Sequence, residues 1–419
     1  MARLLIQGQR PLRGAVRVAG AKNAALPMLA ASLLSAEESV FDNVPDIEDI
    51  HTIVELLRQL GAEVDYSPAD HRVRVQAREL GNPTVPPALA AKARASFLVV
   101  GPLAARLGRV FAPHPGGCAI GTRPVNVDIK GLSSMGATIG AEEGYYAIRV
   151  PGRLHGGNIY LDYPSHTGTE NLLLAATLAK GKTTIKHAAA EPEVTALASL
   201  LSAMGARIKG AGTSIIEVEG VDELHGVRYT VLPDRIEAGT FAIAAAISAG
   251  ELAISPVVMP HMDPLTHKLR EVGVEVEEDG DTYRVRGGGP LASAELQTLP
   301  YPGFPTDLQA CFSALLTQAR GTSIVHERVY DNRLQYASEL DKMGARIEVQ
   351  GQTASIFGPT PLRGATVRAL DLRAGAALVL AALAADGQTT VEDVHHLERG
   401  YEDIVGKLKA VGASIRREQ

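Results

Sequence analysis

The chain has 419 residues, of which 46% are hydrophobic, and it exceeds the size at which one hydrophobic core usually stops growing. Aromatic residues make up only 4% and Trp is absent, so Ala, Leu, Val and Ile must form the cores; we predict two domains of the α/β (α+β) class. The net charge of −6, without long runs of Lys or Arg, gives no electrostatic basis for a nucleic-acid partner.

The chain carries no recognisable export or membrane signal. Two cysteines, Cys118 and Cys311, are too few for a disulfide framework and fit a reducing compartment. Residues 1–8 lack the apolar core of a signal peptide, and the longest apolar stretch, 376–385, is about half of the roughly 20 residues that span a bilayer. We therefore expect a cytoplasmic protein without a membrane span.

One short pattern recurs six times along the chain: Leu, two variable residues, an apolar residue, Gly, two variable residues, then Val or Ile. Successive copies lie roughly 70 residues apart, and each is typical of a helix end, a left-handed glycine and a strand that begins at once. The glycines of the six copies are Gly61, Gly136, Gly205, Gly273, Gly344 and Gly412.

A second pattern, Leu, a basic residue and Gly, precedes several Ala-rich segments, for which we predict helices over 23–34, 170–179, 239–248 and 374–385. The repeating unit is then strand, helix, strand, loop, helix, strand, with both helices able to cover one sheet face. Six units split most simply three and three, near residues 231–234. An open solenoid is the alternative, but its periods are usually about 20 to 50 residues.

Three motifs suggest chemistry and fail on spacing. Gly181-Lys182-Thr183 lacks the earlier glycine of a phosphate loop, so it predicts the start of a strand. Residues 287–289 are all Gly, but no dinucleotide fingerprint surrounds them. Histidines such as His395 and His396 have neither protease nor Cys/His ligand spacing, so no metal site is predicted.

The two cysteines differ in context. Cys311 lies in an apolar helical segment, which favours a buried, inert thiol. Cys118 follows Pro115-Gly116-Gly117 in a predicted loop, with Arg123 five residues later; a nearby guanidinium favours the thiolate. A reactive thiol and an ordinary surface cysteine both remain open on these grounds.

Other charged residues lie at the joints of the repeats. Helix N-termini carry free N–H groups, so several of them together with Lys and Arg would attract phosphate and carboxylate groups, although each residue alone is more often a cap or an ion-pair partner. The residues at these joints are Lys22, Asn23, Thr306, Asp307, Arg333, Asp371, Arg373 and Arg399.

Six motifs, running in order between about residues 3 and 415, carry a family resemblance. They are residues 21–27 (AKNAALP), the Cys118 loop with 123–125 (RPV), 232–237 (LPDRIE), 304–307 (FPTD), 371–373 (DLR) and 399–401 (RGY). With them the chain resembles the UDP-N-acetylglucosamine enolpyruvyl transferases of the EPSP synthase/enolpyruvate transferase family.

The resemblance implies two inside-out α/β barrel domains of three repeats each, residues 22–232 and residues 1–21 plus 233–419, with the active site in the cleft between them. It implies transfer of the enolpyruvyl group of phosphoenolpyruvate to the 3-hydroxyl of UDP-N-acetylglucosamine, through a tetrahedral intermediate and with release of phosphate. This reaction is the first committed step of peptidoglycan synthesis. No cofactor or metal is implied, and a monomer or weak homo-oligomer is expected.

The resemblance also assigns residues. Cys118 would protonate phosphoenolpyruvate, form a covalent adduct with it and react with fosfomycin, its loop closing over the bound sugar nucleotide, and Asp307 is the candidate base. Lys22, Arg123 and Arg399 would bind phosphoenolpyruvate, with Arg333 and Arg373 nearby. Contacts to the UDP-sugar are implied for Asn23, Arg94, Arg123, Pro124, Val125, Asn126, Val127 and Asp307, and Val329 is a further substrate-binding residue.

The chain departs from the family pattern at His166, Asn126, Asp128 and Glu48, which puts nucleotide affinity in doubt rather than the reaction class. His166 either adds a contact to the pyrophosphate or caps a helix. Two other functions stay open. One is 5-enolpyruvylshikimate-3-phosphate synthase, a relative that lacks the cysteine loop and the motif of residues 22–27 in the form seen here. The other is a non-catalytic scaffold, which would predict loss of Cys118, Asp307 or Lys22, and all three are present.

Overall fold

The computed structural model describes residues 2–114 and 125–418. These residues form two compact units: unit 1 runs up to Ala19 and again from Pro233 onward, and unit 2 contains the residues described between Gly20 and Leu232. Both units mix helices with small sheets, so the predicted mixed α/β class is confirmed. Within the described ranges, no helix has both the length and the apolar character needed to cross a membrane.

Unit 1 holds three four-stranded sheets with the same pairing pattern. In each, one edge strand runs parallel to its neighbour and the other pairs are antiparallel. In pairing order, the sheets are β15 (Glu275–Asp279), β16 (Thr282–Arg286), β14 (Glu251–Ser255), β2 (Arg13–Arg17); β17 (Glu295–Gln297), β18 (Gly321–His326), β20 (Thr353–Gly358), β19 (Arg346–Gln350); and β21 (Thr366–Arg368), β22 (Gln388–Glu392), β1 (Arg3–Gln7), β23 (Ser414–Glu418).

Unit 2 repeats this pattern twice in full and once in part. Its sheets are β13 (Arg228–Thr230), β3 (Glu38–Asp42), β5 (Arg72–Gln76), β4 (Glu63–Ser67); β9 (Asn158–Tyr160), β10 (Lys182–Lys186), β12 (Ile215–Glu219), β11 (Arg207–Lys209); and β6 (Arg109–Pro113), β8 (Tyr145–Arg149), β7 (Thr138–Glu142). In the last sheet, a single parallel bridge between Thr84 and Phe111 replaces the parallel edge strand.

Each repeat contains a first helix and a second helix. The first helices are α1 (Lys22–Ala31), α4 (Val100–Leu107), α6 (His166–Thr177), α8 (Arg235–Ile247), α10 (Thr306–Leu316) and α12 (Leu372–Ala384). The second helices are α2 (Glu48–Gln59), α5 (Asn126–Ser134), α7 (Pro192–Ala203), α9 (Asp263–Glu271), α11 (Tyr336–Lys342) and α13 (Ile404–Ala410). The remaining helical segments are α3 (Pro87–Lys92) and the 3₁₀ turns η1 (Ser32–Leu34), η2 (Pro68–Asp70), η3 (Arg94–Val99), η4 (Met259–His261) and η5 (Val394–Arg399).

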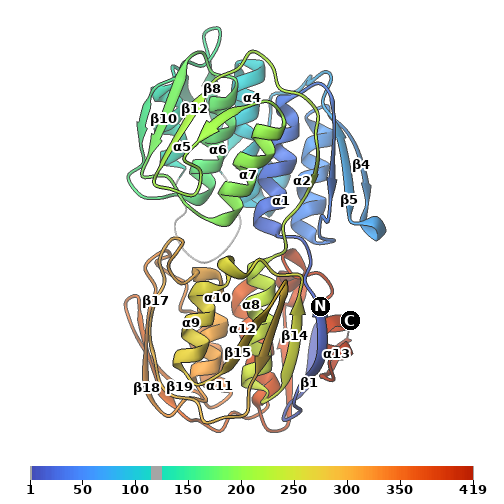
Figure 1. The fold of residues 1–419 in the computed structure, drawn as a ribbon, viewed down its shortest axis with the longest axis vertical. Helices are drawn as coiled ribbons and strands as arrows, with labels where there is room; N and C mark the ends of the chain where they lie inside the picture. The colour runs from blue at the N-terminus through green and yellow to red at the C-terminus, as the bar shows by residue number, and fades with distance from the viewer. Residues whose placement is uncertain (1, 115–124, 419) are drawn as a thin grey trace. The chain divides into compact units, whose positions relative to one another are not determined.

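The first helices form the centre of each core. Every residue of α8 is buried, and in unit 1 α8, α10 and α12 pack against one another, as Figure 1 shows. Their alanines permit this close approach, since a small side chain lets neighbouring helices pack tightly. The sheets and second helices then cover this helical centre, and α1, α4 and α6 join the separate core of unit 2.

The predicted helix-to-strand joint is confirmed at all six glycines, each of which has a left-handed φ between +91° and +108°. At Gly136 (φ +93°) an added Cβ would meet nothing within 4 Å. Backbone conformation, rather than lack of space, therefore requires glycine at this joint.

The predicted unit is one strand short. Five second helices are followed by a hairpin rather than a single strand, for example β4 and β5 after α2. The second strand of this hairpin lies between β3 and β4 and supplies the backbone hydrogen bonds that join them. Without it β3 and β4 would not pair, which is why the extra strand is needed.

Two predicted helices begin about one turn too late. α6 starts at His166 because the Ser165 hydroxyl accepts a hydrogen bond from the Gly168 N–H at 3.1 Å. α8 starts at Arg235 because Asp234 accepts from the N–H groups of Ile236 and Glu237 at 2.7 and 3.1 Å. Ser165 and Asp234 are the N-cap residues of these helices, and the apolar periodicity does not reveal them because they are polar.

Candidate active site

Asp307, the second residue of α10, lies between two buried arginines of unit 1. Arg333 Nη2 donates to Asp307 Oδ1 at 2.7 Å, and Arg373 Nη2 donates to Oδ2 at 2.8 Å. The side chains of both arginines are 4% exposed, whereas that of Asp307 is 23% exposed. The carboxylate is thus fixed by a charge-assisted hydrogen bond on each oxygen while it stays accessible.

Aromatic rings lie beneath both guanidinium groups. Arg333 lies 5.1 Å from the centroid of the Tyr330 ring, and Arg373 lies 5.3 Å from that of Tyr401. Burial is the largest single influence and disfavours the charged form of both arginines, but Asp307 together with the other acidic and tyrosine groups nearby outweighs it, so each pKa lies above its ordinary value. Both side chains therefore present a permanent positive charge beside Asp307.

Arg399 and Val329, also predicted to bind substrate, belong to unit 1. Arg399 ends η5 and is half-buried. Val329 follows β18, is exposed, and its N–H donates to Glu327 Oε1 at 2.8 Å. Glu327 also accepts from the Thr306 hydroxyl at 2.8 Å, which links the Val329 segment to the start of α10.

Cys311 lies on the same helix as Asp307 and is fully buried, as predicted. Burial raises the pKa of its thiol to about 12, so the thiolate is not available near neutral pH. The prediction of a buried thiol at this position is confirmed, and its inertness stays a prediction.

In unit 2, Lys22 and Asn23 open α1 as predicted. The Lys22 ammonium lies 3.1 Å from Asp49 Oδ2, in the first turn of α2, and both side chains are largely buried. Asp49 was not identified from the sequence. Its partner lies 27 residues away, on a different helix, so no local pattern connects the two.

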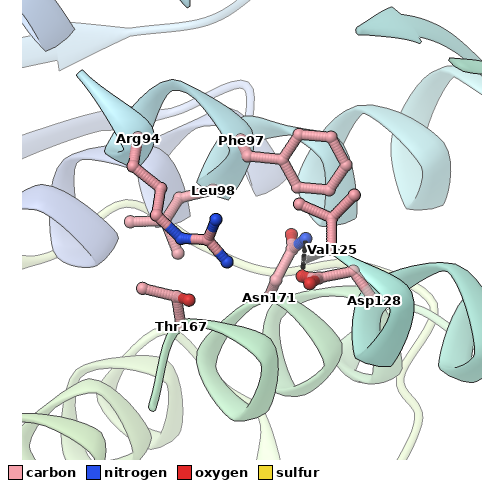
Figure 2. Close-up of a pocket in the computed structure, with 7 residues that line it drawn as sticks. All are labelled: Arg94, Phe97, Leu98, Val125, Asp128, Thr167 and Asn171. Atoms are coloured by element: carbon pink, nitrogen blue, oxygen red, sulfur yellow. Dashed lines mark hydrogen bonds between the residues drawn. The ribbon is translucent and has the colours of Figure 1, made fainter. Parts of the chain in front are cut away.

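A small pocket in unit 2 contains two more of the predicted residues, Arg94 and Val125 (Figure 2). Arg94 opens η3, and Val125 precedes the first turn of α5. Asn126 and Val127, two further predicted residues, follow Val125 in the sequence; Asn126 is exposed and Val127 is buried. The other side chains that line the pocket are Phe97 and Leu98 of η3, Asp128 of α5, and Thr167 and Asn171 of α6.

His166 precedes Thr167, which lines this pocket. Its Nε2 atom forms an ion pair with Glu170 Oε1 at 3.1 Å. Burial lowers the pKa of His166, but the charge of Glu170, with Glu191 and Glu193, outweighs it and raises the pKa to about 10. The carboxylate of Glu170 thus favours the protonated form of the imidazole. His166 is the first residue of α6, but the N-cap is Ser165, so capping is not the role of His166.

Three predicted residues, Cys118, Arg123 and Pro124, lie outside the described residues. The assignment of Cys118 as the reactive thiol stays a prediction. Within residues 2–114 and 125–418, no group of three or more His, Cys, Asp or Glu side chains is placed to hold a metal ion.

Comparison with known proteins covers nearly the whole chain. The family model of EPSP synthase (3-phosphoshikimate 1-carboxyvinyltransferase) matches residues 6–408. A UDP-N-acetylglucosamine 1-carboxyvinyltransferase of Finegoldia magna is 50% identical over 409 residues, 97% of this chain and 96% of the relative. One from Acidobacterium capsulatum is 49% identical, over 100% of this chain and 96% of the relative. The chain belongs to the UDP-N-acetylglucosamine 1-carboxyvinyltransferase family.

Solved structures agree on the fold of this family member. The enolpyruvyl transferase NikO from Streptomyces tendae superposes with a TM-score of 0.91 at 29% identity, covering 99% of this chain and 98% of that chain. EPSP synthase from Acinetobacter baumannii superposes with a TM-score of 0.77 over 100% of both chains, and at 18% identity it shows the shared fold alone.

The side chains of this 1-carboxyvinyltransferase family member suit anionic substrates. Unit 1 presents an accessible carboxylate held by two permanent cations, and unit 2 presents Lys22 at the start of α1 and Arg94 in a pocket. A fixed carboxylate can accept a proton, and guanidinium or ammonium groups bind phosphate and carboxylate groups.

Proposed function

We propose that the protein transfers the enolpyruvyl group of phosphoenolpyruvate to the 3-hydroxyl of UDP-N-acetylglucosamine and releases phosphate. The observation that carries this proposal is the near-complete alignment, at 46 to 50% identity, with relatives that bear this name. The reaction is the first committed step of peptidoglycan synthesis, and a cytoplasmic location fits both substrates.

The proposed chemistry is addition followed by elimination. The sugar 3-oxygen forms a bond to C2 of phosphoenolpyruvate as Asp307 accepts the hydroxyl proton and Cys118 delivers a proton to the methylene carbon C3. A tetrahedral intermediate results. It then loses a proton from C3 and its phosphate from C2, which regenerates the double bond in the product. The two hydrogen bonds that hold Asp307 favour this role, since a base must be positioned before it can act.

Cations are proposed to bind the anionic groups of both substrates. Lys22, Arg123 and Arg399 would hold phosphoenolpyruvate, with Arg333 and Arg373 nearby. The sugar nucleotide would contact Asn23, Arg94, Asp307, Val329 and residues 123–127. Because these residues come from both units, we propose that turnover requires residues of unit 1 and of unit 2.

The finer architecture is proposed on the same grounds. The repeated pairing pattern of the sheets and the buried first helices support two inside-out barrels of three repeats each. We further propose that the protein works without a cofactor or a nucleic-acid or membrane partner, as a monomer or weak homo-oligomer.

The test is phosphate release from phosphoenolpyruvate in the presence of UDP-N-acetylglucosamine. We expect turnover by the native protein, its loss in Cys118→Ser and inactivation by fosfomycin. Cys311→Ala is the matched control, and it should keep both activity and fosfomycin sensitivity because its thiol is buried. Activity that is indifferent to Cys118→Ser and to fosfomycin would remove the thiol from the mechanism.

Asp307 is tested with Asp307→Asn, which keeps the shape of the side chain. We expect turnover to fall by about 100-fold or more, the usual minimum for loss of general acid–base catalysis. Asp42→Asn is a close control, because Asp42 also lies between two arginines, Arg72 at 2.7 Å and Arg228 at 2.8 Å. Equal turnover in native protein and Asp307→Asn would exclude the base, and turnover with shikimate 3-phosphate instead of the sugar nucleotide would favour EPSP synthase.

A further inference from the structure

Asp128 is a buried carboxylate that lines the unit 2 pocket. It lies in the first turn of α5, and only 3% of its surface is exposed. The proposed reaction gives Asp128 no role. A buried carboxylate without a function or a partner is costly, so the contacts around this one indicate what it does.

The first contact of Asp128 is with Asn171 of α6. Asn171 Nδ2 donates to Asp128 Oδ1 at 2.7 Å, and Asn171 Oδ1 accepts from the Gly101 N–H of α4 at 2.7 Å. Both ends of the amide therefore have fixed partners, and only one amide orientation satisfies them. A Cβ on Gly101 would lie 2.3 Å from the Asn171 carbonyl oxygen, so glycine is required for this approach of the two helices.

The second influence on Asp128 is the charge of Arg94, which lines the same pocket. Figure 2 shows the Arg94 guanidinium, from η3, pointing across the pocket toward Asn171 and Asp128. Burial has the largest effect and raises the pKa of the Asp128 carboxyl, and the Asn171 hydrogen bond and the charge of Arg94 offset only part of this rise. Asn171 and Arg94 thus both favour the ionised carboxylate, and the carboxylate in turn attracts the guanidinium.

We propose that Asp128 is a positioning residue that, together with Asn171, holds the Arg94 guanidinium in the pocket and thereby sets the affinity for the UDP portion of the sugar nucleotide. This inference rests on the proposed function, in which Arg94 contacts that substrate. Asp128 itself does not touch the reacting atoms. Its removal therefore weakens binding of the nucleotide and leaves the chemical step unchanged.

The main test is steady-state kinetics of Asp128→Asn, which removes the charge and keeps the shape. We expect the KM for UDP-N-acetylglucosamine to rise by about tenfold, the usual order for loss of one charge-assisted contact. The kcat and the KM for phosphoenolpyruvate should stay within about twofold of the native values. Asp42→Asn, in the same unit and outside the pocket, is the control and should change none of the three.

A double-mutant cycle shows whether Asp128 acts through Arg94. Arg94→Gln alone should raise the same KM, and the double variant should raise it no further than Arg94→Gln does. Additive effects would overturn the inference, as would a fall in kcat in Asp128→Asn. If Asp128→Asn does not fold, Asn171→Ala replaces it, because it removes the hydrogen bond to the carboxylate and should give the same rise in KM.

Calorimetric titration with UDP separates this inference from the proposed function. Native protein that binds no UDP would contradict both. Native protein that binds UDP, with Asp128→Asn binding it equally well, would overturn the positioning role alone. Weaker UDP binding by Asp128→Asn, with an unchanged thermal unfolding midpoint, would support it.

Discussion

Glu237 makes the stability of unit 1 depend on pH in a direction that can be stated in advance. Its side chain is 3% exposed; one carboxylate oxygen accepts from Lys407 Nζ at 2.7 Å and the other from the Ala19 N–H at 2.6 Å. Burial is the largest influence and exceeds the opposing effect of these partners, so the pKa of Glu237 rises from 4.5 to about 7.

The sign follows from proton binding. Between pH 4.5 and about 7 the folded protein keeps the Glu237 proton while the unfolded chain has lost it, so the free energy of unfolding falls as the pH rises. At about 1.4 kcal/mol for each tenfold change in proton affinity, the full effect is about 3 kcal/mol. Above the folded-state pKa the effect levels off.

The assay compares native protein with Glu237→Gln, which cannot titrate, by urea unfolding at a series of pH values from 5 to 8. The difference in unfolding free energy, native minus variant, should decrease by about 2 to 3 kcal/mol across this range. Glu251→Gln is the control; its pKa is lowered through the hydrogen bond from Arg286, so its difference should stay flat above pH 5. Parallel stability curves for native protein and Glu237→Gln would refute the reasoning.

Three further predictions concern single contacts. Asp49→Asn removes the carboxylate charge 3.1 Å from Lys22 and should raise the KM for phosphoenolpyruvate several-fold in initial-rate assays. An unchanged KM would show that the Lys22–Asp49 ion pair does not contribute to phosphoenolpyruvate binding. Ser165→Ala deletes the N-cap of α6 and should lower the unfolding free energy by about 1 kcal/mol in urea, with no loss if the cap contributes nothing. Gly136→Ala should lower the free energy of unfolding by about 1 kcal/mol or more, because alanine is strained at a φ of +93°. Gly140→Ala is the control, since an added Cβ meets nothing within 4 Å at either position, and it should cause no such loss. Equal melting temperatures for the two variants would disprove the backbone argument.

Sequence patterns predicted features that depend on neighbouring residues. A left-handed glycine after a helix is a local requirement of the backbone, and so the joint at Gly136 and its five equivalents could be located without a structure. Apolar periodicity likewise predicted the Ala-rich first helices. It placed the starts of α6 and α8 too late because caps such as Ser165 and Asp234 are polar and lie outside the periodic segment.

Those local patterns could not predict contacts between side chains that are far apart in the sequence. Asp307, Arg333 and Arg373 were each identified, but the partners of Asp307 lie 26 and 66 residues away, so the sequence could not reveal that both arginines hold one carboxylate. Asp128 was noticed only as a departure from related sequences. Its burial depends on helices that are distant in sequence, and an acidic residue in a first helical turn is usually solvated.

The placement of charge in these repeats has a physical cause. α12 is buried from Leu372 to Leu383, so a charged side chain in its middle would have neither water nor a partner. Its first turn is different, because free N–H groups and the cap provide polar contacts there. Arg373 of α12 and Asp307 of α10 both lie in first turns, as does Lys22 of α1 in the other unit. In a core of Ala-rich helices, the helix start is therefore a position at which a charged side chain can be accommodated, and repeating the unit multiplies the number of such positions.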